Sequence, residues 1–297
     1  MSVNHRRVII ERLFHMIFMV AALFAVVSVA MIIFFIFGKG LAPFIPGNEF
    51  GTTSVIDFLS GLKWAPKAGD YGIGYMIVSS ILATAGAIVI GVPIALMTAV
   101  FIAEVAPKRL ANLVRPAIEL LAAIPSVLYG VFGFAVITPA IKSISPHPSG
   151  DSLLAVILVL TIMILPTIVT VVETSIRAVP MSYKEGSLAL GASKIQTIFK
   201  VTLPAAKSGI LTGVVLGVGR AIGETMAVIL VAGNPESGIP QTIFDKVRLL
   251  TTNIALEQSY ATDMHLQMLF STAVVLFIFI MIINFVLSRI QAKAGEQ

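Results

Sequence analysis

Six long apolar runs constrain this chain more than any other feature of its sequence. Coiled as helices, they are each about long enough to cross the hydrocarbon core of a bilayer, and none shows the alternation of barrel strands. The runs cover residues 13–37, 74–103, 116–141, 152–179, 210–232 and 265–287. Only 12% of the residues are charged, against about 25% in soluble domains. We therefore expect an all-α integral membrane protein with six transmembrane helices.

Several other classes of function are disfavoured. The chain has no Cys, and its four His are scattered, so we expect neither thiolate metal sites nor a bound metal. The apolar runs hold no nucleophile–base pair, so we do not expect an enzyme. The net charge of +5 lies mainly in loops and at one end of the spans. It is better explained as an orientation signal facing lipid than as a nucleic-acid surface.

The basic residues also predict the topology. The first run follows Arg6, Arg7 and Arg12; it is too long for a signal peptide and lacks a small-residue cleavage site, so we interpret it as a span. Both termini are then cytoplasmic, with roughly twice as many Lys and Arg residues inside as outside. The predicted division is 1–37 (N-terminus and first span), 38–73 (outer loop), 74–288 (transmembrane core, including an inner loop at 180–207 and an outer loop at 233–264) and 289–297 (cytoplasmic tail).

Two charges interrupt the fifth run, Arg220 and Glu224. A charge at the centre of a bilayer costs at least about 2.5 kcal/mol. Their spacing of four places both on one face of a continuous helix, and the small residues Gly217, Gly219 and Gly223 would let another backbone approach. The pair is either part of a translocation path, where Arg220 meets an anion, or an internal ion pair that locks helices together.

Other polar positions leave similar alternatives. Glu119 lies one turn after Arg115, so it either forms an interfacial ion pair or has a gating role. Glu173 and Arg177, again four apart, are expected at the interface. Pro125 is expected to kink the third span. In the first outer loop, Val55, Phe58, Leu59, Leu62 and Trp64 form an amphipathic patch, which predicts an interfacial helix with Trp64 at the membrane–water boundary.

The inner loop predicts two short helices joined at Gly191. Ser182 with Glu185, and Ser193 with Gln196, have the spacing of a capping box. In the second helix, an apolar face is expected to contain Ile195, Ile198 and Phe199. That helix either lies flat on anionic lipid or docks into a groove of a soluble partner.

The same loop resembles the EAA loop of ATP-binding-cassette importer permeases. That motif has an acidic residue, two small residues, a Gly six places after the acid and a Leu-Pro ending. Here it is Glu185-Gly186-Ser187, Gly191 and Val201-Thr202-Leu203-Pro204, with Gly-Ser in place of the usual Ala-Ala. In the family this loop docks on an ATPase subunit. The resemblance favours a protein partner over lipid and implies these coupling residues: Glu185, Gly186, Gly191, Ile195, Ile198, Phe199, Leu203 and Pro204.

Two further stretches, IELLAAIPSVLYG (118–130) and GRAIGETMAV (219–228), are similar to PstC-type permeases of phosphate-specific importers. The sister PstA family has Ala-Pro where this chain has Met226-Ala227. The resemblance implies a type I importer permease bundle in a prokaryotic cytoplasmic membrane. It implies as partners a PstA-like second permease, two ATPase subunits that bind ATP and Mg²⁺, and an extracytoplasmic phosphate-binding protein. The chain itself lacks a phosphate-loop motif, so we expect no cofactor in it.

The expected mechanism follows from charge. We expect Arg220, Glu224, Thr225 and Glu119 to line the substrate path. A guanidinium can bind two phosphate oxygens, and Glu224 would hold or release Arg220. Open alternatives are a different oxyanion such as sulfate or molybdate, a proton-coupled secondary transporter with Glu224 as proton carrier, and a signalling subunit.

Overall fold

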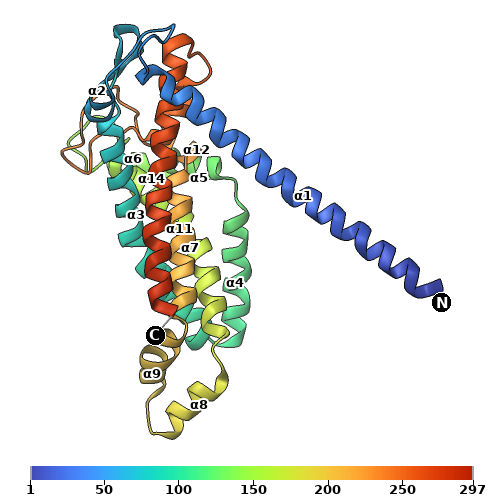
Figure 1. Ribbon diagram of the computed structural model, residues 1–297. Helices are drawn as coiled ribbons and strands as arrows, with labels where there is room; N and C mark the ends of the chain where they lie inside the picture. The colour runs from blue at the N-terminus through green and yellow to red at the C-terminus, as the bar shows by residue number, and fades with distance from the viewer. Residues whose placement is uncertain (1, 296–297) are drawn as a thin grey trace.

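The computed structural model describes residues 2–295 as one elongated helical bundle (Figure 1). Its α-helices are α1 (Ser2–Leu41), α2 (Val55–Ser60), α3 (Gly74–Val100), α4 (Lys108–Ala123), α5 (Ser126–Phe132), α6 (Thr138–Lys142), α7 (Leu153–Arg177), α8 (Met181–Ala189), α9 (Lys194–Thr197), α10 (Leu203–Ala205), α11 (Lys207–Gly223), α12 (Met226–Ile229), α13 (Leu250–Glu257) and α14 (Asp263–Gly295). Three π-helical segments are η3 (Phe101–Val105), η4 (Gly133–Ile137) and η5 (Ile198–Thr202). Short 3₁₀ turns are η1 (Ala42–Phe44) and η2 (Pro66–Ala68).

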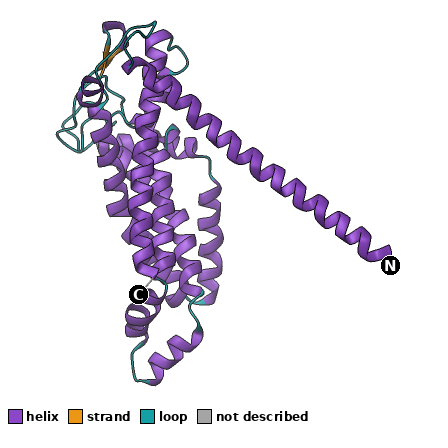
Figure 2. Cartoon of the chain, viewed as in Figure 1, coloured by secondary structure: helices purple, strands orange, loops and turns teal. Residues whose placement is uncertain are grey.

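The β-strands of the described residues lie in one loop, between α2 and α3. Strands β1 (Trp64–Ala65) and β2 (Asp70–Tyr71) form a small antiparallel hairpin within the part of the chain that the structure describes (Figure 2). The hairpin lies with α2 at one end of the bundle, whereas α8 and α9 lie at the opposite end, near the C-terminus (Figure 1). We refer to these as the outer and inner ends, following the orientation predicted from the basic residues.

Helix α7 is the centre of the bundle. Of its most apolar stretch, 67% is buried inside the chain, compared with 33% for α3, 22% for α14 and 0% for α1. It packs against α3, α11 and α4, as expected for a helix that is apolar on all sides. In contrast, α1 contacts α14 near the outer end and then runs away from the bundle (Figure 1). Its free faces are therefore open to lipid or to another subunit.

Four of the six predicted spans are continuous helices, in α1, α3, α7 and α14. The third span is bent by 98° between Lys108–Ala123 and Ser126–Lys142. The fifth follows a bend of 70° between Lys194–Ala205 and Lys207–Gly223, which lies at Ala206, before the predicted span begins. Counting each bent pair as one span gives six. The predicted tail is a helical continuation of α14 as far as Gly295, and residues 296–297 lie outside the described part.

The third span is broken where only a kink was predicted. Helix α4 ends at Ala123, and Ile124 and Pro125 are extended, with ψ of 128° and 138°. Proline has no N–H to donate and disfavours the helical conformation of the residue before it. The Tyr129 hydroxyl donates to the Leu121 carbonyl at 2.6 Å, which satisfies part of the freed backbone of α4.

The fifth span is also broken, which contradicts the prediction of one helix from 210 to 232. Helix α11 ends at Gly223, Glu224 is extended with a ψ of 135°, and α12 begins at Met226. The Glu224 carbonyl accepts a hydrogen bond from the Thr251 hydroxyl at 2.9 Å. Because the chain leaves the helix between them, Arg220 and Glu224 do not share one helix face.

Candidate functional site

The two broken spans meet inside the bundle. Helix α5, which follows the first break, packs against α12, which follows the second. A Cβ added to Gly130 of α5 would lie 2.7 Å from the Ala227 Cα and 2.9 Å from its carbonyl oxygen. Only glycine permits so close an approach. Irregular backbone at membrane depth is tolerated where protein or a water-filled route covers it, so this junction is the natural place to seek a path.

Arg220 lies in the last turn of α11 and is half-buried. Its Nη1 donates to the Thr167 hydroxyl of α7 at 3.2 Å. Among the side chains that the structure describes, no carboxylate lies within ion-pair distance of its guanidinium. The predicted pairing with Glu224 is therefore wrong for this conformation, and Arg220 carries a positive charge with a neutral partner.

The Glu224 carboxylate is instead directed toward α12. The residue is buried, and its Oε1 accepts a hydrogen bond from the Ala227 N–H at 3.1 Å. The adjacent Thr225 hydroxyl donates to the Gly223 carbonyl at 3.2 Å. A carboxylate at the start of a helix satisfies backbone N–H groups that have no partner within the helix. The break thus separates the two charged groups. The Arg220 guanidinium is available to a ligand, whereas the Glu224 carboxylate is bound to the backbone of α12.

The glycines of α11 divide into two groups. Gly217 packs closely against α7, since a Cβ there would lie 2.6 Å from the Ile168 side chain, although its neighbour is a side chain and not the backbone that was predicted. Gly219 and Gly223 have no described atom within 4 Å of such a Cβ. Beside them, Leu216 is exposed. This face of α11 is open in the single subunit.

Glu119 does not join this arrangement in the described contacts. It is exposed on α4, and its predicted partner Arg115 binds Glu173 instead, with Nη2 and Oε1 2.5 Å apart. The Arg177–Glu173 pair is confirmed at 2.5 Å, but Glu173 is buried rather than interfacial. One carboxylate therefore holds two arginines at the inner end.

The inner loop has the predicted helix–turn–helix form. Gly191 joins α8 to α9 with a φ of +85°, a conformation that glycine adopts without penalty. The capping box of Ser193 with Gln196 is present. The other one is absent, because α8 begins directly after Pro180 and Ser182 lies inside it.

The apolar face of this loop differs from the prediction. Ile195 is 69% exposed, and Phe199 is also exposed, but Ile198 is only 4% exposed. Ile198, the first residue of segment η5, belongs to the apolar core of the bundle. Leu190, which the sequence analysis missed, is 91% exposed. Of the other predicted coupling residues, Glu185, Gly186 and Pro204 are exposed and Leu203 is half-buried.

A groove of about 520 Å³ separates α8 from α9 and η5. Its lining combines small, apolar and polar side chains: Ser182, Tyr183, Gly186, Ser187, Leu190, Ala192, Gln196, Lys200 and Val201. Such a surface is suited to contact with another protein.

The outer end holds a buried cluster that the sequence analysis missed. Arg248, only 3% exposed, forms an ion pair with Glu257, and His265 Nε2 lies 2.9 Å from a Glu257 oxygen. Burial acts to raise the pKa of the Glu257 carboxyl, but the hydrogen bond and charge of Arg248 outweigh it and hold the pKa below its ordinary value. Trp64 is fully buried beside His265, so its predicted place at the membrane interface is wrong.

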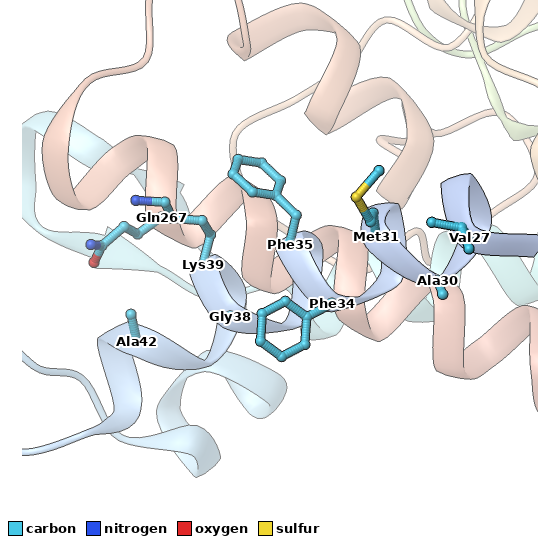
Figure 3. A pocket seen from close by; sticks show the side chains of 9 residues that line it. All are labelled: Val27, Ala30, Met31, Phe34, Phe35, Gly38, Lys39, Ala42 and Gln267. Atoms are coloured by element: carbon cyan, nitrogen blue, oxygen red, sulfur yellow. The ribbon is translucent and has the colours of Figure 1, made fainter. Parts of the chain in front are cut away.

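Another groove lies elsewhere, between α1 and α14, and measures about 740 Å³. Figure 3 shows its lining side chains: Val27, Ala30, Met31, Phe34, Phe35, Gly38, Lys39, Ala42 and Gln267. Only Lys39 and Gln267 are polar. This surface suits acyl chains or an apolar helix and lacks the converging polar groups that an inorganic anion requires.

The fold is that of an integral membrane permease. It combines helices long enough to cross a bilayer, two broken spans in contact with each other, and an exposed helical loop at one end. The chain belongs to the family of binding-protein-dependent transport system inner membrane components, which matches residues 91–294. It is 38% identical to the probable ABC transporter permease protein YqgH of Bacillus subtilis over 92% of this chain and 90% of that protein. It is 32% identical to the phosphate transport system permease protein PstC of Pasteurella multocida, covering 83% and 84%.

Solved structures agree on the fold. A MetNI methionine ABC transporter chain in an inward-facing conformation superimposes with a TM-score of 0.55 at 22% identity, covering 75% of this chain and 94% of that one. A chain of a bacterial ABC transporter involved in alginate import gives 0.62 at 16% identity, covering 95% and 99%. The architecture is that of type I ABC importer permeases.

Proposed function

We propose that this chain is the permease subunit that forms half of the translocation path of an ATP-driven importer for inorganic phosphate. The observation that carries the proposal is Arg220, a half-buried guanidinium within an apolar span that has no described carboxylate partner. A structural arginine at that depth would need a counter-charge. The relatives named as phosphate permeases support phosphate as the anion.

The chemistry of the site suits a small oxyanion. Phosphate loses hydration when it enters the bilayer, and the planar guanidinium of Arg220 offers two parallel N–H donors to its oxygens. In the conformation described, Glu224 is engaged by the Ala227 N–H and leaves Arg220 available. A later return of Glu224 to Arg220 would compete with phosphate and release it.

Other protein chains would provide the ATPase, the second half of the path and the delivery of substrate. An ATPase subunit, which would bind ATP and Mg²⁺, docks on the exposed Leu190, Ile195 and Phe199. A related second permease covers the open face of α11 at Gly219 and Gly223 and completes the path. A phosphate-binding protein delivers substrate at the outer end.

The test is phosphate uptake by the reconstituted complex in vesicles. We expect uptake to require ATP and to be unaffected by excess sulfate or molybdate. Arg220→Gln should reduce uptake about 10- to 100-fold, because a hydrogen bond to a charged group contributes about 1.5–3 kcal/mol. Lys142→Gln, an exposed cation outside the path, is the matched control. Full uptake by Arg220→Gln at normal membrane levels would remove this residue from the path.

One rival has a specific observation in its favour. Glu224 is a buried carboxyl within a predicted span, the kind of group that carries protons in secondary transporters. That mechanism would operate with this chain alone. Uptake driven by a proton gradient in vesicles that contain only this chain, without ATP, would establish it in place of the importer.

A further inference from the structure

Helix α8 is attached to the bundle at one charged point. Within α8, only Lys184 and Ser187 are not exposed. They are three residues apart and therefore lie on one helix face. Ser187 contacts Thr197 within the same loop, with the hydroxyl oxygens 3.0 Å apart. Lys184 Nζ reaches out of the loop to the Glu104 Oε1 at 2.5 Å, and the two side chains are only 16% and 12% exposed.

Glu104 belongs to η3, the π-helical end of α3. There the Ala106 N–H donates to the Phe101 carbonyl at 2.7 Å, five residues back. The next π-helical bond, to the Ile102 carbonyl, would need an N–H from Pro107, which has none. Arg177 of α7 supplies the missing donor, with Nη2 3.0 Å from the Ile102 carbonyl oxygen. The segment that receives Lys184 is thus stabilised by α7.

These contacts close a triangle at the inner end. Residues 178–180 join α7 to α8 along the chain, Arg177 joins α7 to η3, and Lys184 joins α8 to η3. Three bodies linked pairwise cannot rotate about one joint without breaking another link. Helix α8 therefore moves together with α3 and α7, and does not hinge at Pro180 while the pair with Glu104 is intact.

The triangle continues toward the broken spans. Arg177 also binds Glu173, which binds Arg115 of α4. Helix α4 leads to the break at Ile124 and Pro125, beyond which α5 packs against α12. A contiguous set of contacts therefore runs from α8 to the junction beside Glu224.

We propose that the Lys184–Glu104 pair is a coupling strut, which transmits displacement of α8 to α3 and α7 and thereby to the substrate path. This inference rests on the proposed function, in that an ATPase subunit moves α8. Neither residue contacts substrate, so both are positioning residues. Loss of a merely structural ion pair would lower the amount of folded subunit, whereas loss of a strut would separate ATP hydrolysis from transport.

The test is charge reversal in the assembled complex, with phosphate uptake and ATP hydrolysis measured on the same vesicles. We expect Lys184→Glu alone, and Glu104→Lys alone, to lower the phosphate transported per ATP by at least about fivefold, the low end of allosteric coupling. ATP hydrolysis and co-purification of the ATPase subunit should persist. The double exchange, Lys184→Glu with Glu104→Lys, rebuilds an ion pair of opposite polarity and should restore most of the ratio.

Lys108→Glu is the matched control, since it reverses an exposed cation of the same inner end and should leave the ratio unchanged. If a reversal prevents insertion, the uncharged Lys184→Gln is measured instead. An unchanged ratio in the single variants, or no recovery in the double exchange, overturns the strut. Absence of ATP-driven phosphate uptake in the unaltered complex counts instead against the proposed function, and the two failures are thereby distinguished.

Discussion

The inner loop (residues 180–207) and the outer cap (residues 44–73 and 233–262) both project from the bundle, but the cap contributes more of its large apolar side chains to a buried cluster. In the inner loop, Leu190, Ile195 and Phe199 are exposed. In the outer cap, Trp64 and Leu250 are fully buried. Exposed apolar clusters on a protein generally mark a surface that a partner covers. The cap therefore has a buried core, although Ile56 and Leu62 on its surface are exposed, and the exposed cluster of the inner loop is the surface that we propose an ATPase subunit covers.

Charge follows the same division. Arg248 and Glu257 of the outer cap form one buried cluster with His265 of α14. In the inner loop, Lys184 of α8 forms an ion pair with Glu104 of the bundle. Breaking a buried pair is costly because it leaves a charge without compensation. Substitutions in the cap should therefore affect folding, while substitutions in the inner loop should affect coupling.

The largest loss of stability is expected for Arg248→Ala. It leaves the Glu257 carboxylate buried without its partner, and we expect a loss of about 3–5 kcal/mol in stability. Trp64, the only tryptophan, lies in the same cap and reports the loss as a fluorescence change during denaturant unfolding. Lys63→Ala removes an exposed pair of the same cap and should have a much smaller effect on stability. Equal effects of the two would contradict a self-contained cap.

A second, smaller contrast separates two isoleucines of the inner loop. Ile198→Ala empties a buried position and should destabilise the subunit by about 2–5 kcal/mol. Ile195→Ala removes an exposed side chain and should change stability by less than about 0.5 kcal/mol, while weakening co-purification of the ATPase subunit. If Ile195→Ala left that association intact, Ile195 would not be part of the surface on which the ATPase subunit docks.

Substitutions at two glycines of the inner loop should have smaller effects on the stability of the subunit. Gly191→Ala forces an alanine to a φ of +85° and should cost about 1–2 kcal/mol; retained transport with a bulky residue there would argue against docking through this turn. Gly186 has open space around it, and Gly186→Ala should favour α8 by up to about 1 kcal/mol. Lost coupling in Gly186→Ala, measured as phosphate per ATP, would therefore identify a contact made by the partner.

The smallest effect near neutral pH is expected from protonation of the cap. The pKa of Glu257 is held below its ordinary value by Arg248, against the opposing effect of burial, and that of Asp245 is lowered chiefly by the Thr242 backbone N–H. Carboxyls with lowered pKa values stabilise the fold above their unfolded values of about 4 and lose that contribution as the pH falls below them. We expect Trp64 emission to shift to the red only below about pH 4.

The matched variant for this titration is Glu257→Gln. Its emission should already be shifted at neutral pH and should vary less on acidification, because the group that titrates beside Arg248 is gone. An identical acid transition in both proteins would show that other carboxyls govern the cap.

Features set by neighbours in sequence could be predicted. Continuous apolar runs locate the spans, Pro125 marks the position of the first break, and Gly191 with the Ser193 capping box defines the inner turn. Each depends on interactions within a few residues. The family resemblance added the role of the inner loop, which periodicity alone left open between lipid and protein.

Features that depend on distant residues were missed. The break at Glu224 is stabilised by Thr251, and the burial of Trp64 depends on His265 and its neighbours, which no local pattern indicates. A helical period also grouped Ile198 with the exposed Ile195 and Phe199, because the period does not indicate which part of that face packs against the bundle core. The pairing of Arg115 with Glu173 rather than Glu119 is again a contact between separate helices.

The central claim is that the break after α11 borders an aqueous phosphate route, and cysteine labelling at Thr225 tests it most directly. The chain has no native cysteine, so Thr225→Cys provides a single thiol beside Glu224. In the assembled complex with ATP, we predict modification by a charged, membrane-impermeant thiol reagent and protection by phosphate but not by sulfate. A thiol that never reacts, or that reacts equally with and without phosphate, would contradict the account.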